Sequence, residues 1–162
     1  MVYIPGTAGN DTLTGSVLDD VIEGFGGFDV ISAAAGNDSV SALAGGDIIF
    51  GNAGNDTIDV NFFGATSPST IYGGSDNDYI EATLGNDTVY GDLGSDTIIG
   101  VSGNDLLIGT NVNNDQLNDL GDRIIGEAGN DVIYGNTGND TLFGDSTGTL
   151  GNDTLYGGRD ND

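Results

Sequence analysis

Large aliphatic residues recur along the chain every nine residues, and the only breaks are three wider spacings of 13, 17 and 13 residues. A period of nine fits neither the 3.6-residue repeat of an α-helix nor the heptad of a coiled coil. The segments centred on these residues, such as Thr57-Ile58-Asp59, can instead form short strands with one side chain turned inward. The series comprises Leu13, Ile22, Ile31, Val40, Ile49, Ile58, Ile71, Ile80, Val89, Ile98, Leu107, Ile124, Ile133, Leu142 and Leu155.

Glycine-rich stretches separate these segments and suit tight turns with positive φ. Two strands and two turns then close one coil of 18 residues, and stacked coils give two parallel sheets around a thin aliphatic core. We therefore predict an all-β fold, a parallel β-roll (solenoid) with two parallel sheets and about eight such coils, as a single module over residues 1–162. Tyr3-Ile4-Pro5 falls in the strand register and is predicted to begin the roll.

Three turns are enlarged, at residues 60–68, 110–120 and 145–150. We expect surface loops there; a binding loop is the alternative, because Phe62 and Phe63 are strongly apolar. Residues 114–117 could also be a distorted repeat, in which case every later turn would change its edge of the roll.

The residue after each core aliphatic is expected to face outward, and on one sheet this position is largely aromatic. Its members are Phe50, Tyr72, Tyr90, Ile108, Tyr134 and Tyr156. β-Propensity and cross-strand packing are the favoured explanation. A docking stripe for another domain or chain is the alternative.

The chain is strongly acidic and lacks histidine and cysteine. Its 26 Asp+Glu against 2 Lys+Arg give a net charge of −24, which excludes a basic nucleic-acid surface and disfavours binding to anionic membranes. Thiolate and imidazole metal sites and the usual general base are also excluded. Metal binding by oxygen ligands remains, which suits Ca²⁺ or Mg²⁺. No apolar run approaches the roughly 18 residues of a membrane span.

An aspartate stands two residues before each core aliphatic, except that Ser69 takes this place once. Carboxylates of stacked coils would lie only about 5 Å apart, which is strongly repulsive unless a cation lies between them. Carboxylates and backbone carbonyls together make the oxygen cage that Ca²⁺ accepts, whereas Mg²⁺ prefers a smaller octahedron. The predicted Ca²⁺ ligands are Asp11, Asp20, Asp29, Asp38, Asp47, Asp56, Asp78, Asp87, Asp96, Asp105, Asp122, Asp131, Asp140, Asp153 and Asp162.

Glycine two residues before the aspartate supports this interpretation, because it lets the backbone bend and point carbonyl oxygens into the gap. The glycines predicted to belong to the metal sites are Gly9, Gly27, Gly36, Gly54, Gly85, Gly94, Gly103, Gly129, Gly138 and Gly151. About 12 divalent ions would cancel the net charge, and we expect roughly 8–12 bound Ca²⁺. Without metal, repulsion should keep the chain expanded, so that binding energy becomes folding energy.

Residues 51–59 (GNAGNDTID) match the pattern G-G-x-G-x-D-x-U-x, where U is a large aliphatic residue. Residues 91–99, 126–134 and 135–143 match it as well. Over residues 3–162 the chain resembles the RTX, or haemolysin-type calcium-binding, repeat family. The resemblance implies a right-handed parallel β-roll with Ca²⁺ between turns of successive coils. It also implies a secreted bacterial protein that leaves the cell by type I secretion and folds outside.

Several turns depart from this pattern. Alanine replaces the first glycine at Ala33, Ala42 and Ala82. Leu18 and Leu120 replace the glycine nearest the aspartate, which makes Asp20 and Asp122 the weakest candidate ligands. The chain stops at Asp162 in mid-repeat, and we expect it to be a piece of a longer protein.

The main functional hypothesis is a non-catalytic, calcium-binding structural module of a secreted protein that folds on binding several Ca²⁺ ions. One alternative is the C-terminal repeat region of a type I-secreted hydrolase or toxin. Another is an adhesin or surface-layer segment with the aromatic stripe as its contact. An enzyme within this chain is not expected, because the repeat accounts for most carboxylates that could form an acid–base pair.

Overall fold

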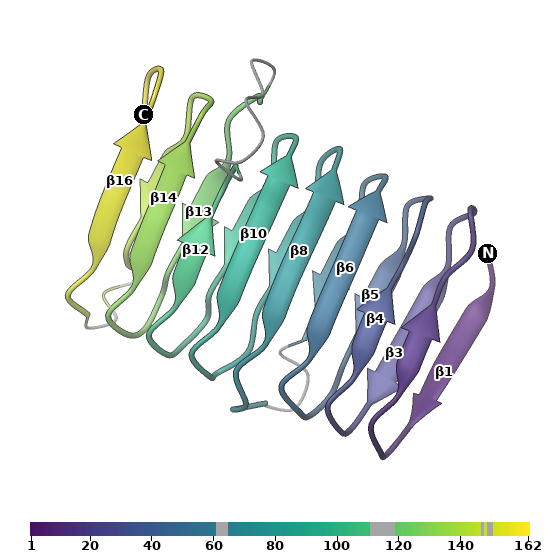
Figure 1. Cartoon of the computed structure of the whole chain (residues 1–162). Helices are drawn as coiled ribbons and strands as arrows, with labels where there is room; N and C mark the ends of the chain where they lie inside the picture. The colour runs from purple at the N-terminus through teal and green to yellow at the C-terminus, as the bar shows by residue number, and fades with distance from the viewer. Residues whose placement is uncertain (61–64, 111–118, 147, 149–150) are drawn as a thin grey trace.

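The computed structural model describes residues 1–60, 65–110, 119–146, 148 and 151–162, and there the chain winds into a β-solenoid. Its strands alternate between two eight-stranded parallel sheets, with the two termini at opposite ends of the stack (Figure 1). The odd sheet contains β1 (Tyr3–Thr7), β3 (Val21–Phe25), β5 (Ser39–Ser41), β7 (Thr57–Asp59), β9 (Tyr79–Glu81), β11 (Thr97–Ile99), β13 (Arg123–Ile125) and β15 (Thr141–Phe143). The even sheet contains β2 (Thr12–Thr14), β4 (Val30–Ser32), β6 (Ile48–Ala53), β8 (Thr70–Ser75), β10 (Thr88–Leu93), β12 (Leu106–Ile108), β14 (Val132–Asn136) and β16 (Thr154–Gly158).

Each strand pairs in parallel with the strand one coil further along the chain. Ile22, for example, pairs with Ile4 on one side and with Val40 on the other. Equivalent positions of the repeat therefore stack directly, which places aliphatic side chains above one another. The prediction of an all-β parallel roll with two sheets is confirmed, and β1 begins at Tyr3 as expected.

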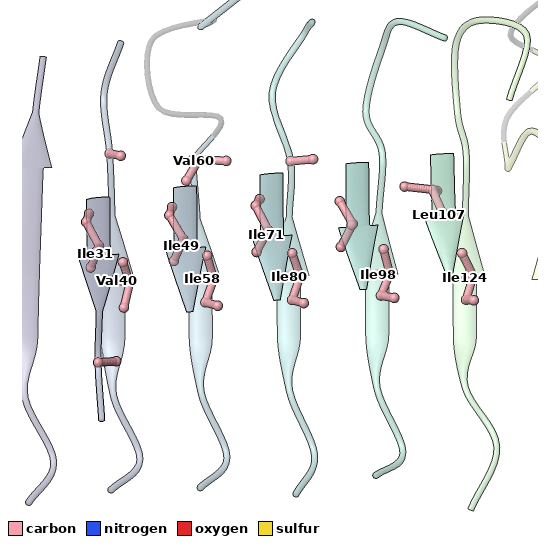
Figure 2. Close-up of a cluster of buried hydrophobic side chains, with 14 of the residues drawn as sticks. Ile31, Val40, Ile49, Ile58, Val60, Ile71, Ile80, Ile98, Leu107 and Ile124 are labelled. Carbon is pink, nitrogen blue, oxygen red and sulfur yellow. The ribbon is translucent and has the colours of Figure 1, made fainter. Parts of the chain in front are cut away.

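The predicted aliphatic series fills the space between the two sheets. Figure 2 shows these side chains in pairs from the two sheets, such as Ile49 of β6 and Ile58 of β7, and the pairs repeat from coil to coil. Every member from Ile22 to Ile133 is fully buried, which confirms the predicted core. Burying such a side chain contributes about 1.5–3 kcal/mol. Leu155 is 41 % exposed, because it lies on the outermost strand β16 and only β14 packs beside it.

The alanines that replace the first glycine of the repeat extend this core. Ala33, Ala42 and Ala82 are all buried, together with Val60 after β7. A small apolar side chain at this place therefore adds packing between the sheets and leaves the order of the strands intact.

The enlarged turns leave the strand order unchanged. β12 and β13 flank the longest of them, and β13 still pairs with β11 and β15. Later turns therefore keep their edge of the roll, and the interpretation that they change edge is wrong. Residues 114–117, Phe62 and Phe63 lie outside the described residues.

The outward-facing stripe lies on the even sheet, as predicted. Phe50 stacks on Tyr72 with ring centroids 5.1 Å apart, and Tyr72 stacks on Tyr90 at 4.8 Å. Tyr134 and Tyr156 stack in the same way at 4.8 Å. This stacking supports cross-strand packing as one role of the stripe.

No helix that could span a membrane is found in the described residues.

Candidate metal centre

The aspartates that precede the strands form two hydrogen-bonded ladders, one along each edge of the roll. The first edge, where the chain passes from the odd to the even sheet, holds Asp11, Asp29, Asp47, Ser69, Asp87, Asp105, Asp131 and Asp153. The second edge, where it passes back, holds Asp20, Asp38, Asp56, Asp78, Asp96, Asp122, Asp140 and Asp162. In both ladders the backbone N–H of each aspartate that has a successor donates to a side-chain oxygen of the next member. The structure thus brings the predicted ligands together in two rows.

Ser69 fills its place in the first ladder without a carboxylate. Its hydroxyl accepts the N–H of Asp47 at 3.2 Å, and its own N–H donates to Asp87 Oδ1 at 2.7 Å. The ladder is therefore continuous at Ser69, but this turn has no negative charge to offer a cation.

The second carboxylate oxygen, Oδ2, divides the turns into two classes. In nine turns it is buried and has no hydrogen-bond partner, and we call these the open turns. They belong to Asp29, Asp38, Asp56, Asp78, Asp96, Asp105, Asp122, Asp131 and Asp140. A buried polar atom without a partner costs free energy, which a cation in contact with it would remove.

The residue four places before the aspartate has an unusual backbone conformation in all eight open turns where the structure describes that residue. Its φ is positive at Phe25, Ala34, Asn52, Gly74, Asp92, Val101, Glu127 and Asn136. Positive φ is rare for residues other than glycine and is an outlier for a β-branched residue such as Val101. Strain of this kind persists where the surrounding structure imposes it, and it concentrates at ligand-binding sites.

Glycine allows the close approach of chain segments within these turns. In the Asp105 turn, a Cβ on Gly100 would lie 2.5 Å from Asp105 Oδ2. A Cβ on Gly103, which has φ of +127°, would lie 1.9 Å from the carbonyl oxygen of Gly85. Neither position can hold a side chain without moving the turn.

In three turns the chain itself satisfies Oδ2, and we call these the closed turns. The donor to Oδ2 is in each case a residue four places earlier: Thr7 donates to Asp11, Ser16 to Asp20 and Thr83 to Asp87. Both the backbone N–H and the hydroxyl of Thr83 donate to Asp87 Oδ2 at 2.8 Å. Gly9 and Gly85, the predicted site glycines of the Asp11 and Asp87 turns, lack the positive φ of their counterparts in open turns.

The pKa shifts of the carboxylates follow this division only in part. Burial, with a contribution from neighbouring carboxylates, raises the pKa to about 8 for Asp78, Asp105 and Asp122, to about 7 for Asp96, and to about 6 for Asp56 and Asp140. In the closed turn of Asp20, the N–H of Ser16 lowers the pKa of the carboxyl. Burial still raises the pKa of Asp87, although Ser69 and Thr83 donate to it. A cation beside the open carboxylates would favour their ionised form.

The remaining predicted ligands differ from both classes. Asp47 follows Gly45, which has φ of +132°, but Leu43 lacks positive φ. Asp153 Oδ1 accepts the N–H of Asp131 at 3.0 Å, and Asp162 is exposed at the end of the second ladder. Among the predicted glycines, positive φ occurs at Gly27, Gly36, Gly54, Gly94, Gly103, Gly129 and Gly138.

A further ladder, outside the aspartates, was missed by sequence reasoning. The residue before each aspartate is often asparagine, and its Oδ1 accepts the N–H of the equivalent residue in the next coil. Asn37 Oδ1 accepts from Asn55 at 2.9 Å, and Asn55 Oδ1 accepts from Asn77 at 2.9 Å. This ladder runs opposite to the aspartate ladder and needs no metal. The recurrent Asn-Asp pair in the sequence was its signal.

Carboxylate oxygens without a partner, together with turns in which the chain approaches closely, offer hard oxygen donors to a metal. Such donors suit Ca²⁺, which accepts six to eight oxygen ligands in flexible geometry. The residues present therefore fit Ca²⁺ at the open turns.

A family model described as the RTX calcium-binding nonapeptide repeat (4 copies) matches residues 5–40, 23–58, 72–107, 118–146 and 147–162. Comparison with curated protein sequences gives no significant match. RTX repeats are structural modules that bind several Ca²⁺ ions, and the buried aspartates are consistent with this. Such repeats are typical of secreted proteins. The chain belongs to the RTX calcium-binding nonapeptide repeat family.

Proposed function

We propose that this chain is a non-catalytic structural module of a secreted protein, and that it folds when Ca²⁺ enters its open turns. The observation that carries the proposal is the set of nine buried Oδ2 atoms without a hydrogen-bond partner. The chain has only 2 Lys+Arg, so its own basic residues cannot neutralise these carboxylates.

Repulsion along the ladders supplies the reason for folding on binding. Two carboxylates about 5 Å apart repel by about 3 kcal/mol at an effective dielectric constant of about 20. The repulsion recurs in each pair of adjacent coils, and a divalent cation between the coils turns it into attraction. Because the expanded chain has no preformed site, the free energy of binding becomes free energy of folding.

The two carboxylate oxygens of an open turn have different roles. Oδ1 accepts the backbone N–H of the ladder residue in the neighbouring coil, and Oδ2 is available to contact the cation. Glycine lets the turn close around the ion. Calcium-binding modules of extracellular proteins bind weakly, with dissociation constants of about 10⁻⁴–10⁻³ M, which suits folding outside the cell.

The kind of protein that contains this module is also part of the proposal. One candidate is a type I-secreted hydrolase or toxin with these repeats at its C-terminal side, and the other is an adhesin or surface-layer protein. In the latter case, the stripe from Phe50 to Tyr156 would be the contact, although its stacked rings already pack on one another. A hydrolase motif upstream in the parent sequence would favour the first possibility, and long further repeats the second.

A circular dichroism titration of the chain with Ca²⁺, with Mg²⁺ as control, tests the proposal. In excess chelator at pH 7.5 we expect little strand signal. Ca²⁺ should restore the signal cooperatively, and Mg²⁺ should not. Full strand signal in chelator would contradict folding on binding, and absence of bound Ca²⁺ in equilibrium dialysis would contradict calcium binding itself.

A further inference from the structure

One turn on the second edge has a carboxylate that the nine-residue repeat does not supply. Asp119 lies three residues before Asp122, where other turns have small residues such as Ala35 and Ala128. One carboxylate oxygen each from Asp119, Asp122 and Asp140 lies within 4.8 Å of the other two. In the part of the chain that the structure describes, no other three acidic side chains are so close.

Two of these side chains are deeply buried and lack a partner for one oxygen. Asp122 is 3 % exposed and Asp140 is 4 % exposed, and Oδ2 of each accepts no hydrogen bond. The hydroxyl of Thr137, in the turn that precedes Asp140, is likewise buried without a partner. These buried atoms without a partner, and not the closeness of the three carboxylates alone, indicate that a ligand belongs here.

Asp119 is held in place by the protein and does not extend freely into solvent. Its Oδ1 accepts the N–H of Gly94 at 3.1 Å, and its Oδ2 accepts the hydroxyl of Thr110. Thr110 is 2 % exposed, and its hydroxyl also lies 3.0 Å from the carbonyl oxygen of Thr137. Asp119 is thus anchored to the preceding coil through Gly94, and Thr110 of its own turn links it to the following coil at Thr137.

The same turn has its glycine one residue later than the other turns. Leu120 stands where other turns have glycine, but Gly121 follows it and has φ of +99°. The flexible residue has moved one place toward Asp122, and Asp122 remains an open turn. The departure at Leu120 therefore accompanies a change in the ligand set.

We propose that Asp119, Asp122 and Asp140 form a three-carboxylate Ca²⁺ site that binds more tightly than the other open turns and fills first as Ca²⁺ rises. The inference rests on the proposed function, because it requires that open turns bind Ca²⁺. The number of charged ligands tunes Ca²⁺ affinity over orders of magnitude, and a third carboxylate adds one charge to the two that stacked turns supply. Asp122 and Asp140 precede β13 and β15, so the ion would fix the coils that follow the longest enlarged turn.

The test compares Asp119→Asn with Asp19→Asn in Ca²⁺ titration calorimetry of the whole chain. Asp19 is a matched control, since it lies on the second edge and accepts the N–H of Asn37 where other turns carry asparagine. Asp119→Asn keeps an oxygen for Gly94 and removes one charge. We expect it to weaken the tightest binding step by about tenfold or more, with the other steps unchanged. Asp19→Asn should leave the tightest step within about twofold of the unmodified chain.

Superimposable isotherms for the two variants would overturn the proposal and leave Asp119 as a surface charge. An unmodified chain that binds no Ca²⁺ would instead refute the proposed function. Asp119→Glu separates loss of a ligand from loss of fold, because it keeps the charge. It should bind Ca²⁺ more tightly than Asp119→Asn, and equal weakening in both variants would contradict the three-carboxylate site.

Discussion

The turns of Asp87 and Asp105 are neighbours on the first edge of the roll, yet the aspartate Oδ2 is hydrogen-bonded in one turn and unpaired in the other. Asp87 Oδ2 receives two hydrogen bonds from Thr83, whereas Asp105 Oδ2 is buried without a partner. The corresponding residue before Asp105 is Val101, with φ of +77°. The residue four places before the aspartate therefore decides whether the chain or a cation satisfies the carboxylate.

The two edges differ in the same respect. On the second edge, every turn from Asp38 to Asp140 is open. On the first edge, the series of open turns is interrupted by Asp47, by Ser69 and by the closed turn of Asp87. We infer that the second edge holds a more continuous row of Ca²⁺ ions and contributes more of the metal-dependent stability.

The largest expected effect is on pH dependence without metal, because many open turns act together. Six open carboxylates have a pKa of about 6 to 8 in the fold, above the ordinary value of 3.8. Protonation therefore stabilises the fold fully below pH about 4, and this stability is lost as pH rises through 6 to 8. Asp20, with a lowered pKa, contributes in the opposite direction.

In chelator, we therefore expect more strand signal at pH 5.5 than at pH 8 by circular dichroism. With saturating Ca²⁺ the dependence should reverse, since protons compete with the metal for the same oxygens. A metal-free chain that loses strand signal on acidification from pH 8 to 5.5 would contradict the raised pKa of the open turns.

The next largest effect should be a difference between the Asp105→Asn and Asp87→Asn variants in their response to Ca²⁺. Asp105→Asn removes a buried unpaired charge and a metal ligand, so it should raise the strand signal in chelator at pH 8 and weaken Ca²⁺ binding. Asp87→Asn weakens the bonds to Thr83, so it should lower the stability of the Ca²⁺-loaded fold by about 1–3 kcal/mol and should not raise the strand signal in chelator. Circular dichroism in chelator and thermal unfolding in Ca²⁺ check both. An equal rise of the strand signal in chelator for the two variants would remove the distinction between open and closed turns.

The smallest expected effect is the conversion of a closed turn into an open one. Thr83→Gly removes the hydroxyl donor and allows the positive φ that Gly74 has in the Asp78 turn. We expect it to add one bound Ca²⁺ in equilibrium dialysis. Thr83→Ser is the control, because it keeps both the hydroxyl and the backbone N–H as donors, as Ser16 occupies this place in the closed turn of Asp20, and it should add none. Identical Ca²⁺ counts for both variants would show that residue 83 does not select between the two classes.

The fold was largely predictable because a single pattern repeats. Aliphatic residues from Ile22 to Ile133 specify the core, and the spacing of the aspartates places them on two edges. The repeat pattern does not predict whether each turn is open or closed. Nothing in the residue type of Val101 or Phe25 predicts positive φ, because the stacked neighbours impose that conformation. The hydroxyl of Thr83 could have been a signal, since threonine favours local bonds to nearby groups.

The two leucines that replace glycine before Asp122 and Asp20 show the same limit of prediction from sequence. Leu120 in place of glycine predicted a weak ligand at Asp122, yet the structure shows an open turn there with Asp119 beside it. At Asp20, Leu18 made the same prediction, and Ser16 closes that turn. One substitution thus accompanies two outcomes, because the neighbouring residues determine which atoms reach the carboxylate.

A crystal structure of the Ca²⁺-loaded chain tests the central claim most directly, by anomalous scattering at the two neighbouring turns. We predict a Ca²⁺ ion about 2.3–2.6 Å from Asp105 Oδ2, and none in contact with Asp87 Oδ2, which should still be bonded to Thr83. An ion on Asp87 Oδ2 with the Thr83 bonds broken, or no ion at Asp105, would contradict the division into open and closed turns.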